Sequence, residues 1–361
     1  MSHSTKSVVI SGYYGFDNLG DEAILEQLCN ELRQIDPGMK ICVLSQNPQS
    51  TSTKYDVESI SRWSVTRIYQ SLDNADLFIS GGGGLFQDSS SIKSVVYYAF
   101  LFFLARIRRV PIFVYAQGIG PLKSNFSRFL TRASMTLATC ISVRDKKSVA
   151  MLDSWDISAN LTCDPVFGLK KCEDSSDTNN GAKKALRIGL SMRQCEALSA
   201  SWLETIKNSL QNSLPENSIV VPLILQENLD KPVLDSVLQK LDKVSIELLN
   251  LKTNDLPSKW MGSIASLDLV IAMRLHALIM ALKSGVPALA LAYDPKVNAV
   301  AKDFDQPYVD MLDSNAQNQF EQKLLELLDN RKNLALKAGK IANDKENEAR
   351  QNKDLLAKFL K

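Results

Sequence analysis

Residues 76–84 read DLFISGGGG, an apolar run that ends in four consecutive glycines. The run predicts a buried strand, and the glycines predict a tight turn from that strand into a helix. Such a turn lets backbone N–H groups approach a ligand and opens a helix N-terminus to negative charge. A sharp turn that only packs against its own sheet is the simpler alternative. No GK[ST] sequence follows and the G-x-G-x-x-G spacing is absent, which argues against ATP hydrolysis and nicotinamide redox chemistry.

The same order of an apolar run, a polar or glycine-bearing loop and a helical pattern recurs along the chain. Strands separated by helical segments predict parallel sheets with crossover helices. Six strands are predicted in the first half, at residues 8–10, 40–44, 76–80, 111–116, 140–143 and 161–163. Four are predicted in the second half, at residues 186–190, 218–225, 267–273 and 287–292.

A change of composition divides the chain. Residues 170–184 read KKCEDSSDTNNGAKK, which is polar and lacks a periodic apolar pattern, as is typical of a linker. With 361 residues the chain exceeds one ordinary domain, so two are the natural expectation. We therefore expect two doubly wound, Rossmann-like α/β domains that face a cleft. The expected bounds are 1–169 for the first domain, 170–185 for the linker, 186–315 for the second domain and 316–361 for C-terminal helices.

The composition argues against nucleic-acid binding and against a metal site. Apolar residues make up 45% of the chain and charged residues 23%, as in globular proteins with proper cores. The 42 basic and 40 acidic residues give a net charge of +2, so no bulk field attracts nucleic acid. The six cysteines are scattered, with no CxxC pair and no histidine nearby. We therefore expect a reducing compartment and no metal site.

The start of the chain, MSHSTKSVVI, has no long apolar core, so we expect no signal peptide and a cytoplasmic location. The most membrane-like stretch is VVYYAFLFFLA (95–105), followed by Arg106, Arg108 and Arg109. Eleven apolar residues are too few to cross a bilayer, which takes about 20. We expect a buried helix here. The alternative is an interfacial helix that makes a peripheral contact with the inner face of the cell membrane through Val95–Arg109.

Polar and glycine residues collect where the predicted strands end, which is where open parallel sheets bind ligands. The chain has two histidines, and His276 is the one outside the first few residues. Its imidazole is the plausible proton carrier near neutral pH, although a histidine at a helix start can also serve only local hydrogen bonds. The candidate residues at strand ends are Asp17, Asn18, Gly82, Gly83, Gly84, Gln117, Arg144, Asp164, Arg193, Arg274, His276 and Lys296.

The loop GYYGFDNLGDEA (12–23) suggests a sugar site rather than a phosphate site. Asp21 and Glu22 already complement the dipole of the following helix. Asp17 and Asn18 can bind hydroxyls while Tyr13, Tyr14 or Phe16 packs on a sugar ring. A capping role for Asp17 is the alternative.

Arg144, Arg274 and Lys296 form a cationic set. Separately, each fits an ordinary surface or salt-bridging residue. Together, beside one histidine, they predict a small anion with several charges. In the tripeptide Asp294-Pro295-Lys296, the proline fixes the backbone just before the lysine.

Seven segments of the chain resemble the polysaccharide pyruvyl transferase family, and within it the CsaB-type enzymes that modify cell-wall polymers for S-layer anchoring. The segments are GYYGFDNLGDEAIL (12–25), SGGGGLFQD (80–88), YAQGIGPL (115–122), SVRD (142–145), CDPVF (163–167), MRLHALI (273–279) and YDPKV (293–297). They span roughly residues 8–300, and the linker and the C-terminal tail add nothing to the resemblance.

The resemblance implies a GT-B-like fold, with the acceptor on the first domain and the donor on the second. It implies transfer of a pyruvyl group from phosphoenolpyruvate to two hydroxyls of one sugar, which forms a cyclic ketal. Arg144, His276 and Lys296 match the residues that handle the donor. The acceptor it implies is a lipid-linked or polymeric cell-wall precursor that contains N-acetylmannosamine.

A mechanism follows as a hypothesis. His276 is the candidate general acid and Asp17 the candidate base. Asn18, Gly82, Gly83, Gly84, Gln117, Arg193 and Arg274 are candidate substrate-binding residues. No cofactor is needed, because phosphoenolpyruvate is itself the donor substrate. Two alternatives stay open: a GT-B nucleotide-sugar glycosyltransferase and a non-catalytic protein that binds anionic glycans. No acidic residue suited to hold a ribose follows the helix that opens at Arg274, which argues against the former.

Overall fold

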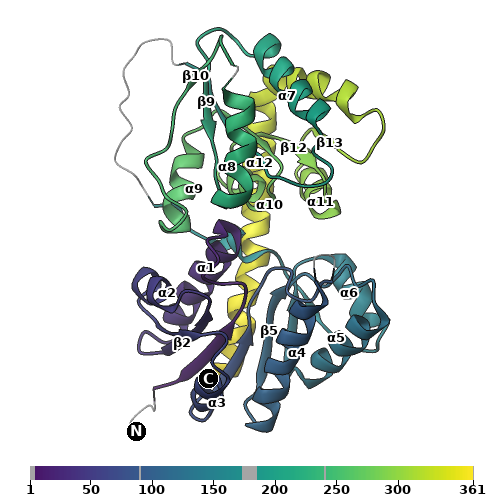
Figure 1. The fold of residues 1–361 in the computed structure, drawn as a ribbon. Helices are drawn as coiled ribbons and strands as arrows, with labels where there is room; N and C mark the ends of the chain where they lie inside the picture. Colours follow the sequence, from purple (N-terminus) through teal and green to yellow (C-terminus); the bar gives the residue numbers. More distant parts are fainter. Residues whose placement is uncertain (1–4, 89–90, 173–184, 240, 361) are drawn as a thin grey trace. The chain divides into compact units, whose positions relative to one another are not determined.

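The computed structural model describes residues 5–88, 91–172, 185–239 and 241–360 (Figure 1). The chain forms two compact units. Unit 1 comprises Met1–Leu169 and Lys345–Lys361, and unit 2 comprises Lys170–Asp344. Most of the linker predicted at 170–185 lies outside the described residues, because 173–184 are not among them.

Unit 1 is built on a seven-stranded parallel sheet with the strand order β3-β2-β1-β4-β5-β6-β7. The strands are β1 (Ser7–Ser11), β2 (Lys40–Ser45), β3 (Glu58–Ser61), β4 (Leu77–Ser80), β5 (Ile112–Gln117), β6 (Cys140–Val143) and β7 (Asn160–Leu161). The helices are α1 (Leu19–Ile35), α2 (Pro48–Tyr55), α3 (Val65–Leu72), α4 (Ile92–Ile107), α5 (Asn125–Leu137), α6 (Lys146–Asp153) and the 3₁₀ helix η1 (Pro165–Gly168). The strand order reverses between β1 and β4, where doubly wound sheets bind ligands.

Unit 2 has a six-stranded parallel sheet with the strand order β10-β9-β8-β11-β12-β13. The strands are β8 (Arg187–Ser191), β9 (Ile219–Pro222), β10 (Ser245–Ile246), β11 (Leu269–Ala272), β12 (Ala288–Ala292) and β13 (Tyr308–Asp310). The helices are α7 (Ala200–Ser213), α8 (Glu227–Leu238), α9 (Pro257–Ala265), α10 (Leu275–Lys283) and α11 (Pro295–Asp303). The order reverses between β8 and β11. The prediction of two doubly wound parallel sheets is therefore confirmed.

The central strands explain why the sequence pattern is readable. All residues of β4 (LFIS), β5 (IFVYAQ) and β12 (ALALA) are buried. Parallel strands covered by helices on both faces give continuous apolar runs rather than alternating ones. These strands therefore stand out in the sequence from the polar loops around them.

The C-terminal segment is one long helix, α12 (Ala316–Leu360). Its residues up to Asp344 belong to unit 2, and those from Lys345 onward belong to unit 1. In unit 1, the buried Asn352 side chain accepts hydrogen bonds from the hydroxyls of Ser142 (2.9 Å) and Thr162 (2.8 Å). Its amide also donates to the Cys163 carbonyl at 3.1 Å. The end of α12 thus completes the β6–β7 side of unit 1.

Helix α4 contains the whole membrane-like stretch 95–105. One of its faces is buried, through Val95, Tyr98, Leu101, Phe102 and Ala105. The prediction of a buried helix therefore holds for that face only, because a second face carries exposed apolar side chains. Among the helices of the described residues, none is long and apolar enough to cross a membrane.

Candidate active site

The loop between β1 and α1 lies at the point where the strand order of unit 1 reverses. Asn18 is the N-cap of α1, because its side-chain oxygen accepts from the Gly20 amide. The alternative that Asp17 caps this helix is therefore wrong. Asp17 is exposed and has a left-handed backbone (φ 55°), which aspartate tolerates better than most residues. Asp17 directly precedes the N-cap of α1, in the loop that follows β1.

The aromatic residues of this loop have different environments. Tyr14 is completely buried, and a Cβ atom on Gly12 or Gly81 would lie within 2.5 Å of its side chain. The suggestion that Tyr14 packs on a sugar ring is therefore wrong. Tyr13 and Phe16 are half-buried and stack on each other, with 4.1 Å between ring centroids and 4° between planes.

Packing requires glycine at three of the four positions after β4, Gly81, Gly82 and Gly83. Gly83 has a left-handed backbone (φ 99°), and a Cβ atom there would lie 2.9 Å from the Asp21 carboxylate. A Cβ on Gly82 would lie 2.9 Å from Ile24, so close packing against α1 excludes larger residues. The Gln117 amide donates to the Gly81 carbonyl, and the Gly118 amide donates to the Gly83 carbonyl at 2.8 Å.

The predicted turn from these glycines straight into a helix is wrong. Helix α4 begins at Ile92, so its N-terminus does not follow Gly84 directly. Gly81, Gly82 and Gly83 are buried, whereas Gly84 is half-buried. The simpler alternative, a turn packed on its own sheet, describes the three buried glycines. A ligand role for Gly82, Gly83 and Gly84 stays a prediction.

Arg144 directly follows β6 and is held by Asp164, which follows β7. The guanidinium Nη1 donates to the Asp164 carboxylate at 2.5 Å, and the two side chains are only 8% and 7% exposed. Gly118 leaves room for this arginine, since a Cβ there would lie 3.0 Å from Nε. Adjacent strand ends therefore bring Gln117, Arg144 and Asp164 together. Asp164 stood among the strand-end candidates, but the sequence did not indicate its pairing with Arg144.

A buried arginine that the sequence analysis missed, Arg62, follows β3. Its guanidinium carbon lies 4.3 Å from the Tyr97 ring centroid, 5.0 Å from that of Phe16 and 5.2 Å from that of Trp63. Its Nη1 donates to the Gly12 carbonyl at 3.3 Å. No carboxylate of the described residues forms a salt bridge with it.

Trp63, next to Arg62, is 62% exposed, and its indole N–H donates to the Gln46 side chain at 2.8 Å. The loops after β1 and β3 thus meet in an aromatic cluster around a cation, at the same edge as Asp17. Tryptophan and phenylalanine rings can pack on apolar ligand faces. We call Tyr13, Phe16, Trp63 and Tyr97 the aromatic cluster.

In unit 2, Arg193 and Tyr293 follow β8 and β12, the strands on either side of β11. Arg193 Nη1 donates to the Tyr293 hydroxyl at 3.0 Å, and the guanidinium lies 5.4 Å from the ring centroid. Burial raises the pKa of Tyr293, and the positive charge of Arg193 opposes that change. The sequence analysis included Tyr293 in the segment YDPKV but gave it no role.

Arg274, which caps the start of α10, is fixed by Asp230 of α8. Its Nε donates to Asp230 Oδ1 at 2.9 Å, and its Nη2 bonds the same oxygen and the Gln226 side chain. Asp230 is fully buried, and its Oδ2 accepts the amides of Leu225 and Gln226 at 2.9 Å. Burial raises the pKa of this carboxyl, and Arg274 opposes that rise. Such a network fixes the start of α10.

His276 and Lys296 lie in the first turns of α10 and α11, directly after the paired strands β11 and β12. Both are half-buried. Asp294 caps α11 by accepting the Lys296 amide at 2.8 Å, and Pro295 occupies the first helical turn. The prediction that this tripeptide fixes the backbone before Lys296 is confirmed. Arg193, Arg274, His276 and Lys296 thus share one edge of the unit 2 sheet.

The site candidates form two groups, one at the strand-end edge of each unit. Asp17, Asn18, the glycines, Gln117, Arg144 and Asp164 belong to unit 1, and the other four residues, Arg193, Arg274, His276 and Lys296, belong to unit 2. A cleft shared by the two groups stays a prediction. No group of three or more metal-ligating side chains occurs within the described ranges.

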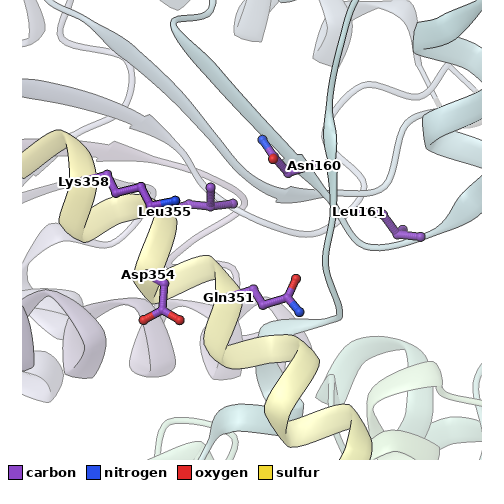
Figure 2. A pocket seen from close by; sticks show the side chains of 6 residues that line it. All are labelled: Asn160, Leu161, Gln351, Asp354, Leu355 and Lys358. Atoms are coloured by element: carbon purple, nitrogen blue, oxygen red, sulfur yellow. The ribbon is translucent and has the colours of Figure 1, made fainter.

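A hollow of about 300 Å³ in unit 1 lies away from these groups (Figure 2). It is lined by Asn160, Leu161, Gln351, Asp354, Leu355 and Lys358, from β7 and one face of α12. None of the candidate residues lines it, so we assign it no substrate.

Several solved structures have a fold similar to that of this chain. Anabaena HepE, crystallised with UDP-glucose, is 14% identical with a TM-score of 0.63, and the match covers 98% of this chain and 99% of that one. A glycosyltransferase from Rickettsia africae is 11% identical with a TM-score of 0.63, at 99% and 100% coverage. The UDP-GlcNAc 2-epimerase from Neisseria meningitidis, bound to UDP-GlcNAc, is 13% identical with a TM-score of 0.60, at 99% coverage of both chains. These matches show the GT-B-like fold.

Sequence comparison is more specific about the family. A search of curated proteins gave no match. The family model for polysaccharide pyruvyl transferases, in contrast, matches residues 18–295. That range begins at Asn18 and ends one residue before Lys296, and it contains Arg144, Arg193, Arg274 and His276. The chain therefore belongs to the polysaccharide pyruvyl transferase family and is a transferase.

Proposed function

We propose that the protein transfers a pyruvyl group from phosphoenolpyruvate to two hydroxyls of one sugar, as a CsaB-type enzyme of its family. The proposal rests on the family match, and the cationic and imidazole side chains at the strand ends support it. Phosphoenolpyruvate carries a carboxylate and a phosphate, which fits Arg144, Lys296 and Arg193. Arginine matches such planar anions through its fork of donors, and lysine adds a point charge.

The reaction then follows in four steps. His276 gives a proton to the methylene carbon of phosphoenolpyruvate, which becomes a methyl group beside an oxocarbenium-like carbon. One sugar hydroxyl attacks that carbon and gives up its proton to a base, for which Asp17 is the candidate. The C–O bond to phosphate breaks, and the second hydroxyl closes the ketal. His276 then regains the proton that Asp17 took from the first hydroxyl, by exchange with solvent, and the proton of the second hydroxyl ends on the phosphate. The protons therefore balance, and the reaction needs no oxidant or reductant.

Arg274 has a positioning role in this proposal. Its guanidinium is bound to Asp230 and Gln226, and its backbone begins the helix that carries His276. The network holds the first turn of α10 in place and thereby orients the imidazole. A direct contact of Arg274 with the donor is a further expectation.

The acceptor side of the proposal uses unit 1. Asp17 and Asn18 would bind sugar hydroxyls, and the exposed Trp63 with Phe16 would cover the apolar face of a sugar ring. The acceptor class is a cell-wall precursor containing N-acetylmannosamine, lipid-linked or polymeric.

The decisive experiment incubates the purified protein with phosphoenolpyruvate and candidate acceptors. Mass spectrometry should find a pyruvate ketal, and phosphate should be released in equal amount. His276→Ala and His276→Gln should lower turnover about 10²–10⁴-fold, the usual contribution of a general acid, with unchanged circular dichroism. Near-wild-type turnover of both variants would remove the proton-donor assignment. Turnover of UDP-sugars without turnover of phosphoenolpyruvate would favour a glycosyltransferase, and binding of glycan without turnover of any donor would favour a non-catalytic protein.

A further inference from the structure

The outer face of α4 carries a continuous row of exposed apolar side chains. They are Ile92, Val96, Phe100, Phe103 and Ile107, each 39–57% exposed. Their spacing of four, four, three and four residues places them on one side of a helix. The opposite side of the same helix packs into the core of unit 1.

Helix α5 extends this row into a surface. It packs beside α4, as Figure 1 shows, and its first two turns expose Phe126 and Phe129. We call these seven side chains, five from α4 and two from α5, the α4–α5 face. Elsewhere, Leu312 and Leu336 are 70% and 76% exposed, and among the described residues the exposed large apolar side chain nearest in sequence to either of them is Leu325. Single exposed apolar residues are ordinary on protein surfaces, whereas a contiguous patch marks an interaction site.

The charge around this face is mainly positive, although the Asp88 carboxylate lies at the start of α5, where it accepts the amides of Lys123 and Ser124. Between residues 89 and 144 the sequence has eight Lys or Arg residues and no Asp or Glu, although the whole chain is nearly neutral. Arg108 pairs with Asp73 of the α3 cap. Six further cations of these two helices and their flanks are exposed: Lys93, Arg106, Arg109, Lys123, Arg128 and Arg132. None of the six has a salt bridge to a carboxylate of the described residues.

We propose that the α4–α5 face docks on an anionic lipid bilayer, with both helices lying in the plane of the membrane surface. Phenylalanine and isoleucine side chains would enter the boundary between headgroups and acyl chains. The arginines and lysines would meet the negative headgroups. A second copy of the chain is the less suitable occupant, because pairing this face with itself would bring six cations of each copy together.

The proposal concerns only unit 1 and does not depend on pyruvyl transfer. It refines the stretch 95–109 predicted from the sequence. Val95, Tyr98, Leu101, Phe102 and Ala105 of that stretch are core residues and take no part. Ile92, Phe126 and Phe129 lie outside it.

Vesicle flotation with the full chain tests the proposal. Wild-type protein should float with vesicles of phosphatidylcholine and phosphatidylglycerol at low salt. It should stay unbound with phosphatidylcholine alone, and the bound fraction should fall as salt rises. The double variant F103E/F129E should lose binding at least tenfold, and R106E/R109E should lose several-fold. Leu336→Glu on α12, a more exposed apolar position outside the face, should bind like wild type.

The folding of each variant is checked by circular dichroism and by its thermal transition. Wild-type protein that does not float with anionic vesicles would overturn the proposal, as would equal binding of a folded F103E/F129E. A concentration-dependent dimer that F103E/F129E breaks, without vesicle binding, would overturn it in favour of self-association.

Discussion

A single buried carboxyl makes the stability of unit 1 sensitive to pH. Glu31 of α1 is buried, and its two oxygens accept hydrogen bonds from the Gln27 amide and the Tyr115 hydroxyl, both at 2.8 Å. Burial raises the pKa of this carboxyl to about 7, although the two hydrogen bonds and the charge of Lys353 act in the opposite direction. Glu31→Gln keeps the shape of the side chain and replaces the titratable carboxyl group with an amide.

The size of the effect follows from the pKa difference. An unperturbed glutamate has a pKa of about 4.3, and each unit of difference corresponds to about 1.4 kcal/mol. Between pH 4.5 and 7 the folded state keeps a proton that the unfolded state has released. The free energy of unfolding therefore falls as pH rises through this window and levels off above it. Between pH 4.5 and pH 8 the loss is about 3 kcal/mol, out of a total of about 4 kcal/mol.

Urea unfolding of wild type and Glu31→Gln at pH 4.5 and pH 8 measures this loss. Wild type should lose about 3 kcal/mol more than the variant, because all other groups titrate equally in both proteins. Hydrogen exchange of the β5 backbone amides measures the unfolding of unit 1 alone, which is needed because the two units can unfold in separate steps. Glu58→Gln, at an exposed position of β3, should show the same pH dependence as wild type. Parallel curves for wild type and Glu31→Gln would refute the assigned pKa.

Three further predictions follow from contacts described above. Asp230→Asn removes the negative charge that pairs with the buried Arg274. It should lower the free energy of unfolding of unit 2 by about 3–5 kcal/mol, measured by amide exchange of β8. A loss below about 1 kcal/mol would mean that the network contributes little to the stability of unit 2. Trp63→Ala should raise the KM for the sugar acceptor several-fold and leave the KM for phosphoenolpyruvate unchanged. Trp63→Phe should have an acceptor KM between those of wild type and Trp63→Ala. Equal acceptor KM values for all three proteins would show that the aromatic cluster is not part of the acceptor site. Gly339 lies in the middle of α12, and apart from its chain neighbours and the backbone of its own helix no atom would lie within 4 Å of an added methyl group. Gly339→Ala should therefore stabilise the protein by about 0.5–1 kcal/mol in thermal unfolding. A lower Tm would contradict the open space there.

The sequence predicted the central strands well because those strands are buried on both faces. The three-residue and four-residue edge strands did not stand out: β3 reads ESIS and β13 reads YVD, and neither forms an apolar run. The missed strand β3 explains why Arg62 and Trp63 escaped notice, since they follow it just as Arg144 follows β6. Edge strands need fewer apolar residues, so their ends are harder to find.

Contacts between residues far apart in the sequence could also not be predicted from the sequence. Asp230 lies 44 positions from Arg274, and Arg193 lies 100 positions from Tyr293. Each pairing depends on how a helix or strand packs, and sequence spacing does not encode that. The sequence indicated which residues stand at strand ends, whereas their partners came from the structure.

The division of α12 between the two units has a consequence for synthesis on the ribosome. The last part of unit 1, from Lys345, is made only after the 175 residues of 170–344. At 5–20 residues per second this interval lasts roughly 10–35 s. Until then Ser142 and Thr162 lack the amide of Asn352 that they bond in the finished protein. During that delay the nascent first unit is without its C-terminal helical segment, although all its strands have been synthesised.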